Sequence, residues 1–126
     1  MIPKFRAWHK HFKVMKKVGQ ITFTEAVWDY QPEQQNDTVG VSIPYQPDYV
    51  LMQSTGMIDE NKAEVFQDDI VWHDQNEDYG VVEIDEAKFV IRWQDGYVED
   101  LFERIDLLGV VGNIHEHSGL LKENGE

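Results

Sequence analysis

The polar stretch Asp-Gln-Asn-Glu-Asp-Tyr-Gly carries the residue types of a cation-binding loop. Asp74, Asn76 and Asp78 place oxygen-bearing side chains at alternating positions, which lets several oxygens converge on one hard cation such as Ca²⁺. The rest of the calcium-loop pattern is missing: Tyr79 stands where the sharp turn needs glycine, and Asp85 stands where the loop needs a bidentate glutamate. We therefore interpret the stretch as a solvated turn, with Asp74, Asn76 and Asp78 as weak metal-ligand candidates.

Two other groups of residues have the types, but not the spacing, of a reactive site. Two histidine pairs, His9 with His11 and His115 with His117, have the spacing that places both rings on one face of a strand, where they could bind zinc together. Neither pair has a third ligand nearby in the sequence. Adjacent acidic residues on a strand point to opposite faces, so they do not converge for acid–base catalysis. Because cysteine and the common hydrolase, P-loop and zinc-protease motifs are absent, we predict no catalytic residue, no metal and no cofactor.

Charge is distributed unevenly along the 126 residues. The chain has 24 acidic and 11 basic side chains, a formal net charge of −13. Residues 1–20 hold six of the basic residues and no acid, so residues 21–126 carry all 24 acids and only five basic residues. The net value argues against a general nucleic-acid binder and against docking on anionic lipid. The asymmetry indicates either a basic hairpin packed over an acidic body or an interaction arm.

One tryptophan stands among the cations of the basic segment. Trp8 shares a strand face with Arg6, opposite the apolar face of the same strand, so it is either a buried residue of a second core or an exposed contact. Aromatic side chains on a small β-domain can bind peptides or stack on bases. The residues that we predict for an interaction surface are Arg6, Trp8, Lys13 and Lys16.

Alternation of apolar and polar residues dominates the sequence and predicts half-buried strands. Residues 29–48 are rich in turn formers and predict a long surface loop with at most one short strand at 39–43. Asp95-Gly96 predicts a type I′ hairpin turn. The main strands that we expect lie at 5–8, 12–18, 49–54, 69–72, 80–85, 88–93 and 107–115, with a further strand or short helix over 20–28, a helix or strand over 99–105 and a helical turn over 118–122.

Short strands with frequent turns favour a mainly β fold, α+β at most, over a parallel α/β sheet. From residue 56 onward, the spacing fits five strands, the size of an SH3-like small β-barrel. We predict an N-terminal β extension over residues 1–55, which contains the loop 29–48, and an SH3-like barrel over residues 56–126, together forming one compact unit. No apolar run reaches the length of a membrane span, and the N-terminus lacks the apolar core of a signal peptide.

Four short sequence blocks occur in an order that is specific as a set. They are Lys-Phe-Arg-Ala-Trp at 4–8, Leu-Met-Gln-Ser-Thr-Gly at 51–56, Asp-Ile-Val at 69–71 and Val-Val-Gly-Asn-Ile-His-Glu at 110–116. With these blocks, the chain resembles the YopX family of phage and prophage proteins over residues 4–121. Two glycines of the family pattern are replaced, by Lys62 and Asp68, so the local turns are expected to differ in type.

The resemblance implies an SH3-like β-barrel with an N-terminal β extension, and a phage-borne gene acting in the bacterial cytoplasm. It implies no activity, cofactor or catalytic residue. We therefore expect a non-enzymatic protein-interaction module that binds an unknown host or phage protein, with homo-oligomer formation as an open alternative. Two further alternatives are direct nucleic-acid binding through the basic residues 4–17 and an acidic body that mimics DNA.

Overall fold

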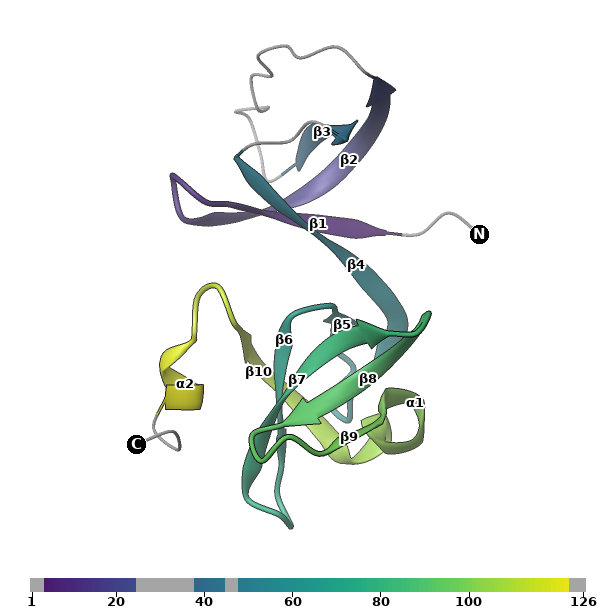
Figure 1. The fold of residues 1–126 in the computed structure, drawn as a ribbon, viewed down its shortest axis with the longest axis vertical. Helices are drawn as coiled ribbons and strands as arrows, with labels where there is room; N and C mark the ends of the chain where they lie inside the picture. The colour runs from purple at the N-terminus through teal and green to yellow at the C-terminus, as the bar shows by residue number, and fades with distance from the viewer. Residues whose placement is uncertain (1–3, 25–37, 45–47, 123–126) are drawn as a thin grey trace. The chain divides into compact units, whose positions relative to one another are not determined.

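The computed structural model describes residues 4–24, 38–44 and 48–122 (Figure 1). The chain divides into two compact units, Met1–Gln53 and Ser54–Glu126. The predicted division lay between residues 55 and 56, two residues further along. Strands dominate both units, so the prediction of a mainly β fold is confirmed. None of the helices in these described ranges is long and apolar enough to cross a membrane.

The first unit is a sheet with β1 at its centre. β1 pairs antiparallel with β2 and with β4, and β3 adds to β2 in parallel. Ala7 and Tyr49 are buried and pack with Val18 and Leu51. The strands of this sheet are β1 (Phe5–His9), β2 (Val14–Thr24), β3 (Thr38–Pro44) and the first half of β4 (Tyr49–Ile58).

One prediction for this unit needs correction. The sequence was expected to form one strand over 12–18 and a separate element from residue 20, but β2 is a single strand of 11 residues. Its length is explained by β3, which pairs with β2 from Lys17 to Thr24 and so satisfies the backbone groups of the second half. The short strand predicted at 39–43 is β3; the rest of the predicted loop 29–48 lies largely outside the described residues.

The second unit is built on an antiparallel sheet in the order β10-β6-β7-β8-β9. Beside it, β4 continues past Gly56, where a positive φ of 79° accompanies a shift in register, and pairs with β5. The elements of this unit are β5 (Glu64–Phe66), β6 (Asp69–His73), β7 (Asp78–Asp85), β8 (Lys88–Trp93), β9 (Val98–Asp100), α1 (Leu101–Arg104), the 3-10 turn η1 (Ile105–Leu107), β10 (Leu108–Asn113) and α2 (Gly119–Lys122).

The five-stranded sheet stays open, which differs from the SH3-like barrel that we expected. β9 and β10 are its two edges and are not paired with each other in the described ranges. The chain passes from one edge to the other through α1 and η1, whose Leu101 and Ile105 are buried in the core. The connection therefore contributes two core side chains on its way between the two edges. The core residues are Val65, Val71, Val82, Ile91, Trp93, Leu101, Ile105 and Leu108.

The tight hairpin turn occurs at a different place from the one predicted. Asp95-Gly96 belongs to a three-residue connection in which Gly96 N–H donates to the Trp93 carbonyl at 2.9 Å and only Gly96 has a positive φ. A type I′ turn needs positive φ at both central residues. Glu86 and Ala87 meet that condition, with φ of 52° and 70°, and join β7 to β8.

Replacing Ala87 with glycine should therefore stabilise the protein. A left-handed conformation costs an L-residue about 1 kcal/mol that glycine does not incur, so we expect Ala87→Gly to raise the free energy of unfolding by about 0.5–1 kcal/mol in urea titrations. Ala63, exposed in another turn but without a positive φ, provides the control, since Ala63→Gly should lower stability. A loss of stability in Ala87→Gly comparable to that of the control would contradict the turn assignment.

Candidate functional site

The three metal-ligand candidates lie in and beside the turn between β6 and β7, and the two aspartates among them accept separate N–H groups. Asp74 Oδ1 accepts the Trp72 indole N–H at 2.6 Å, and the Asn76 backbone N–H donates to His73 Nδ1 at 3.2 Å. Asp78 Oδ1 accepts a backbone N–H from the next residue. Across the residues that the structure describes, no three His, Cys, Asp or Glu side chains are grouped to hold a metal ion.

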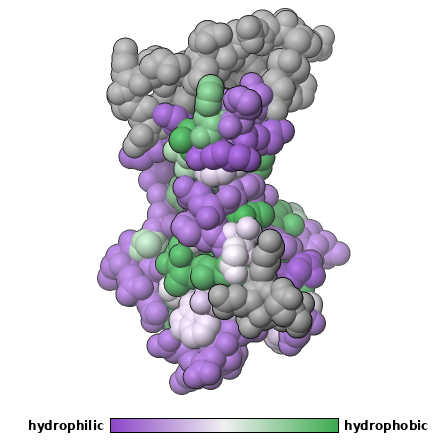
Figure 2. All heavy atoms as spheres, turned by 90° about the vertical axis from the view of Figure 1, so that its left-hand side faces the viewer, coloured by the Kyte–Doolittle hydropathy of each residue, from purple (hydrophilic) through white to green (hydrophobic). Residues whose placement is uncertain are grey.

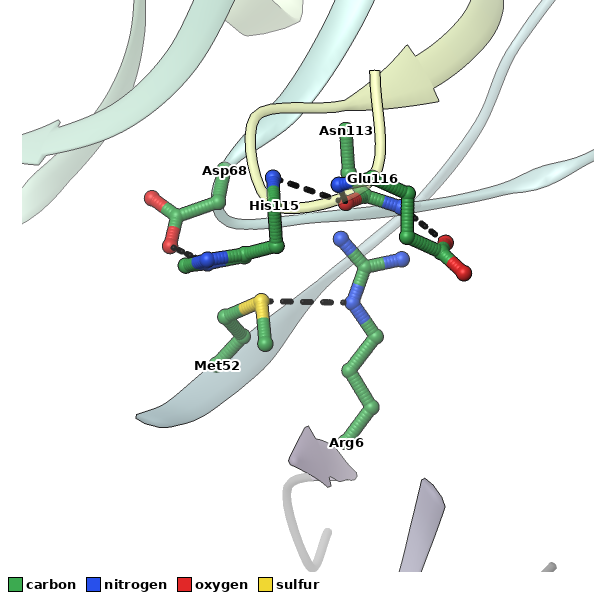
Figure 3. Close-up of polar contacts among 6 residues, drawn as sticks. All are labelled: Arg6, Met52, Asp68, Asn113, His115 and Glu116. Carbon is green, nitrogen blue, oxygen red and sulfur yellow. Dashed lines mark hydrogen bonds and ion pairs between the residues drawn. The ribbon is translucent and has the colours of Figure 1, made fainter. Parts of the chain in front are cut away.

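The four residues predicted for an interaction surface do not lie on one face. Arg6 and Trp8 share a face of β1, whereas Lys16 is the cross-strand partner of Ala7 and therefore lies on the opposite face. Arg6 is half-buried, with its Nε 3.4 Å from the Met52 sulfur (Figure 3). Trp8 is only 7% exposed, so of its two expected roles the structure places it as a buried residue.

Lys13 does lie on the surface, in the turn between β1 and β2 that we call the hairpin tip (Lys10, His11, Phe12 and Lys13). Phe12 was expected in the return strand, but β2 begins only at Val14. As a result, the Phe12 side chain is 65% exposed. Strand alternation could not identify this residue, because it belongs to a four-residue turn in which the period-two pattern does not apply.

A buried histidine holds the hairpin tip in one conformation. His9 Nδ1 accepts the backbone N–H groups of His11 at 3.2 Å and Phe12 at 2.9 Å, and the His9 carbonyl accepts the Lys13 N–H at 2.8 Å. The rings of His9 and Phe12 stack with their centroids 4.5 Å apart. These contacts order the backbone of the hairpin tip and the ring of Phe12.

The lysines of this hairpin carry uncompensated charge. Lys10 and Lys13 are exposed at the tip, and Lys16 and Lys17 follow in β2. Within the described part of the chain, none of the four forms an ion pair with an acidic residue. On the face in Figure 2, hydrophilic side chains cover most of the described surface, and apolar ones appear only in small groups.

Polar residues in and beside the family blocks have structural roles in the second unit. Asp59 is 4% exposed, and its Oδ1 accepts the backbone N–H groups of Asn61 and Ala63, both at 2.8 Å. Its Oδ2 accepts the N–H of Val110 in β10, also at 2.8 Å. Asp69 Oδ2 accepts the Phe66 N–H at 2.8 Å. Each carboxylate therefore satisfies backbone donors that burial would otherwise leave unpaired.

The Gly-Asn-Ile-His-Glu block also forms a turn in which one side chain accepts backbone N–H groups. Asn113 Oδ1 accepts the N–H groups of His115 and Glu116 at 3.0 and 2.9 Å, and its amide donates to the Glu116 carboxylate at 2.8 Å (Figure 3). His115 Nε2 lies 3.0 Å from Asp68 Oδ2. Gly112 is required because a Cβ there would lie 2.5 Å from the ring of His117. The second histidine pair thus holds a turn together.

A polar pocket, which the sequence did not predict, lies beside the β6–β7 turn. It has a volume of about 200 Å³, and its lining includes Trp93, Glu99 and Arg104. Glu99 accepts the Trp93 indole N–H at 2.6 Å through one oxygen, and its other oxygen lies 3.4 Å from Arg104 Nη1. Arg104 Nη2 lies 3.4 Å from Nε2 of the buried His73. These residues come from four separate elements, β8, β9, α1 and β6, so no spacing in the sequence indicated them.

Removing the Asp59 carboxylate should strongly destabilise the second unit. Asp59→Ala leaves three backbone N–H groups without their acceptor, and we expect it to lower the free energy of unfolding by about 2–4 kcal/mol in urea titrations. Glu60→Ala, an exposed acid in the same turn, should change it by less than about 0.5 kcal/mol. Equal effects of the two substitutions would show that the Asp59 hydrogen bonds contribute little.

Comparison with known proteins places the chain in a family. The profile described as YopX protein matches residues 4–122. Among solved structures, the chain is similar to the crystal structure of protein EF1440 from Enterococcus faecalis, with 26% sequence identity, a TM-score of 0.61 and coverage of 96% of this chain and 99% of that one. No curated protein sequence matches the chain. Because the profile spans nearly the whole sequence, the resemblance carried by the four blocks is confirmed, and the chain belongs to the YopX protein family.

Proposed function

We propose that this protein is a non-enzymatic interaction module that binds an acidic surface of another protein through its hairpin tip. The observation that carries the proposal is the combination of a largely exposed Phe12 with flanking lysines that have no acidic partner among the described residues. As expected for a phage-encoded member of the family, the partner would be a host or phage protein of the bacterial cytoplasm.

The rigidity of the hairpin tip supports this role. Ordering a flexible loop during association costs free energy, and a loop fixed in advance avoids most of that cost. The two hydrogen bonds to His9 Nδ1 and the stacked ring provide this order in the free protein. Phe12 would act as the apolar anchor of the interface, since a few large side chains carry most of the binding energy in protein complexes.

The lysines supply the second part of recognition. Exposed charges of one sign attract a surface of the opposite sign and raise the rate of association, an effect that salt weakens. The buried polar residues elsewhere in the chain support binding over catalysis, because Asp59, Asp69 and Asn113 already accept backbone N–H groups. Such side chains hold the fold and are not free to act on a substrate.

Reversing charge at the hairpin tip tests the proposal. The wild-type protein, Lys10→Glu/Lys13→Glu and Phe12→Ala are immobilised and exposed to a bacterial lysate, and captured proteins are measured by quantitative mass spectrometry. We expect at least one acidic protein to be captured about tenfold less by each tip variant. Lys62→Glu/Lys88→Glu, which changes the net charge equally in the second unit, should capture it as the wild type does. Capture that is unaffected by both tip variants would rule out the tip as the contact.

Nucleic acid is a second candidate partner, favoured by the position of Phe12 among four lysines. Such a group could stack on a base while the lysines contact phosphates. Fluorescence anisotropy with a labelled single-stranded DNA oligonucleotide at low salt would distinguish the two partners. Binding that falls steeply with salt and is lost in Phe12→Ala would favour nucleic acid, whereas no binding at low salt would eliminate it.

A further inference from the structure

The pocket of the second unit contains a positive group whose hydrogen-bonding capacity is mostly unused. Arg104 has five N–H donors. Its one acceptor among the described residues is Glu99, at the long distance of 3.4 Å, and its Nε is buried without a partner. Its side chain is 30% exposed, so part of the guanidinium is accessible from the pocket. An acceptor group bound there would therefore meet unused donors.

The histidine next to Arg104 cannot serve as this acceptor. His73 Nδ1 already accepts the Asn76 backbone N–H, so the proton of a neutral ring is on Nε2. That nitrogen faces Arg104 Nη2 at 3.4 Å, which sets two donors against each other with no acceptor between them. A carboxylate or carbonyl oxygen bound at this end of the pocket would therefore accept hydrogen bonds from donors that have no acceptor.

The rest of the lining carries charge of the opposite sign. Asp78 and Asp95 both line the pocket, and each uses Oδ1 to accept uncharged N–H groups. Neither forms an ion pair with a cationic residue within the described ranges. Glu99, in contrast, is engaged through both oxygens. The two aspartates thus leave a negative region next to the Tyr97 ring, which is 62% exposed and suited to a cation.

We propose that this pocket binds a small zwitterion, a molecule that carries both a carboxylate and a protonated amine, as free amino acids do. The carboxylate would accept from Arg104, and the ammonium group would lie between Asp78, Asp95 and Tyr97. The two aspartates would repel a simple anion, and a simple cation would leave the N–H donors of Arg104 without an acceptor. A ligand with both charges can pair with both groups.

The size of the pocket agrees with a ligand of this class. Its volume of about 200 Å³ is enough for several water molecules, and therefore for a ligand of a few heavy atoms. Sites for drug-sized ligands are larger, from about 300 Å³ upward. The pocket lies within the second unit, so this proposal is independent of the hairpin tip and of the proposed function.

The Trp93 indole N–H offers a direct reporter, because it lies in the lining and donates to Glu99. The full-length protein is titrated with glycine, β-alanine and 4-aminobutyrate, whose two charges lie progressively further apart, and with acetate and ethylammonium as single-charge controls. We expect at least one zwitterion to shift the Trp93 indole signal saturably in proton–nitrogen NMR spectra. The Trp72 indole, bonded to Asp74 outside the lining, should not move.

Two variants remove the two halves of the site separately. Arg104→Gln and Asp78→Asn/Asp95→Asn should each weaken zwitterion binding at least about tenfold, and the second variant preserves side-chain size if the first one fails to fold. Arg92→Gln and Asp85→Asn/Asp106→Asn, which leave the lining intact, should bind as the wild type does. The proposal is overturned if no zwitterion gives a saturable shift, if acetate or ethylammonium shifts the signal equally, or if Asp78→Asn/Asp95→Asn binds like the wild type.

Discussion

The Asp59 carboxylate is the contact on which the second unit most depends. Its two oxygens accept three backbone N–H groups, two in the turn after β4 and one, from Val110, in the edge strand β10. This joins segments 51 residues apart in the sequence through a buried charged group. A buried carboxylate is tolerated only when hydrogen bonds replace its hydration, and here the backbone donors that need acceptors also supply those bonds.

Asp69 and Asn113 likewise accept backbone N–H groups through their side chains. The polar residues that identify the family therefore largely maintain its fold. The candidate binding surfaces lie elsewhere, at side chains that can still form hydrogen bonds or ion pairs with another molecule. The hairpin tip presents an aromatic ring that stacks on His9, together with exposed lysines, and the pocket is lined by Arg104 and two aspartates. Both sites consist of residues outside the buried hydrogen-bonded turns. For this reason, the residues of the candidate sites are not the residues of the four sequence blocks.

Local pattern predicted the elements whose partners are close in sequence. The alternation that indicated strands at 80–85 and 88–93 corresponds to β7 and β8, which pair across a two-residue turn. The predictions were wrong for features that depend on segments far apart in the sequence. The extent of β2 depends on parallel pairing with β3, and the open edges of the second sheet depend on α1 and η1 covering its core.

The sequence by itself determined the mainly β fold, membership of the YopX family and the concentration of positive charge in the first 20 residues, because alternation, short motifs and charge are local properties. Only the tertiary structure decided that Trp8 is buried while Phe12 is exposed, that Lys16 and Arg6 lie on different faces of the sheet, and that Arg104 shares a pocket with Asp78 and Asp95. These outcomes depend on strand register and on contacts between distant segments. A local pattern contains no information about which distant donor or charge will face a given side chain.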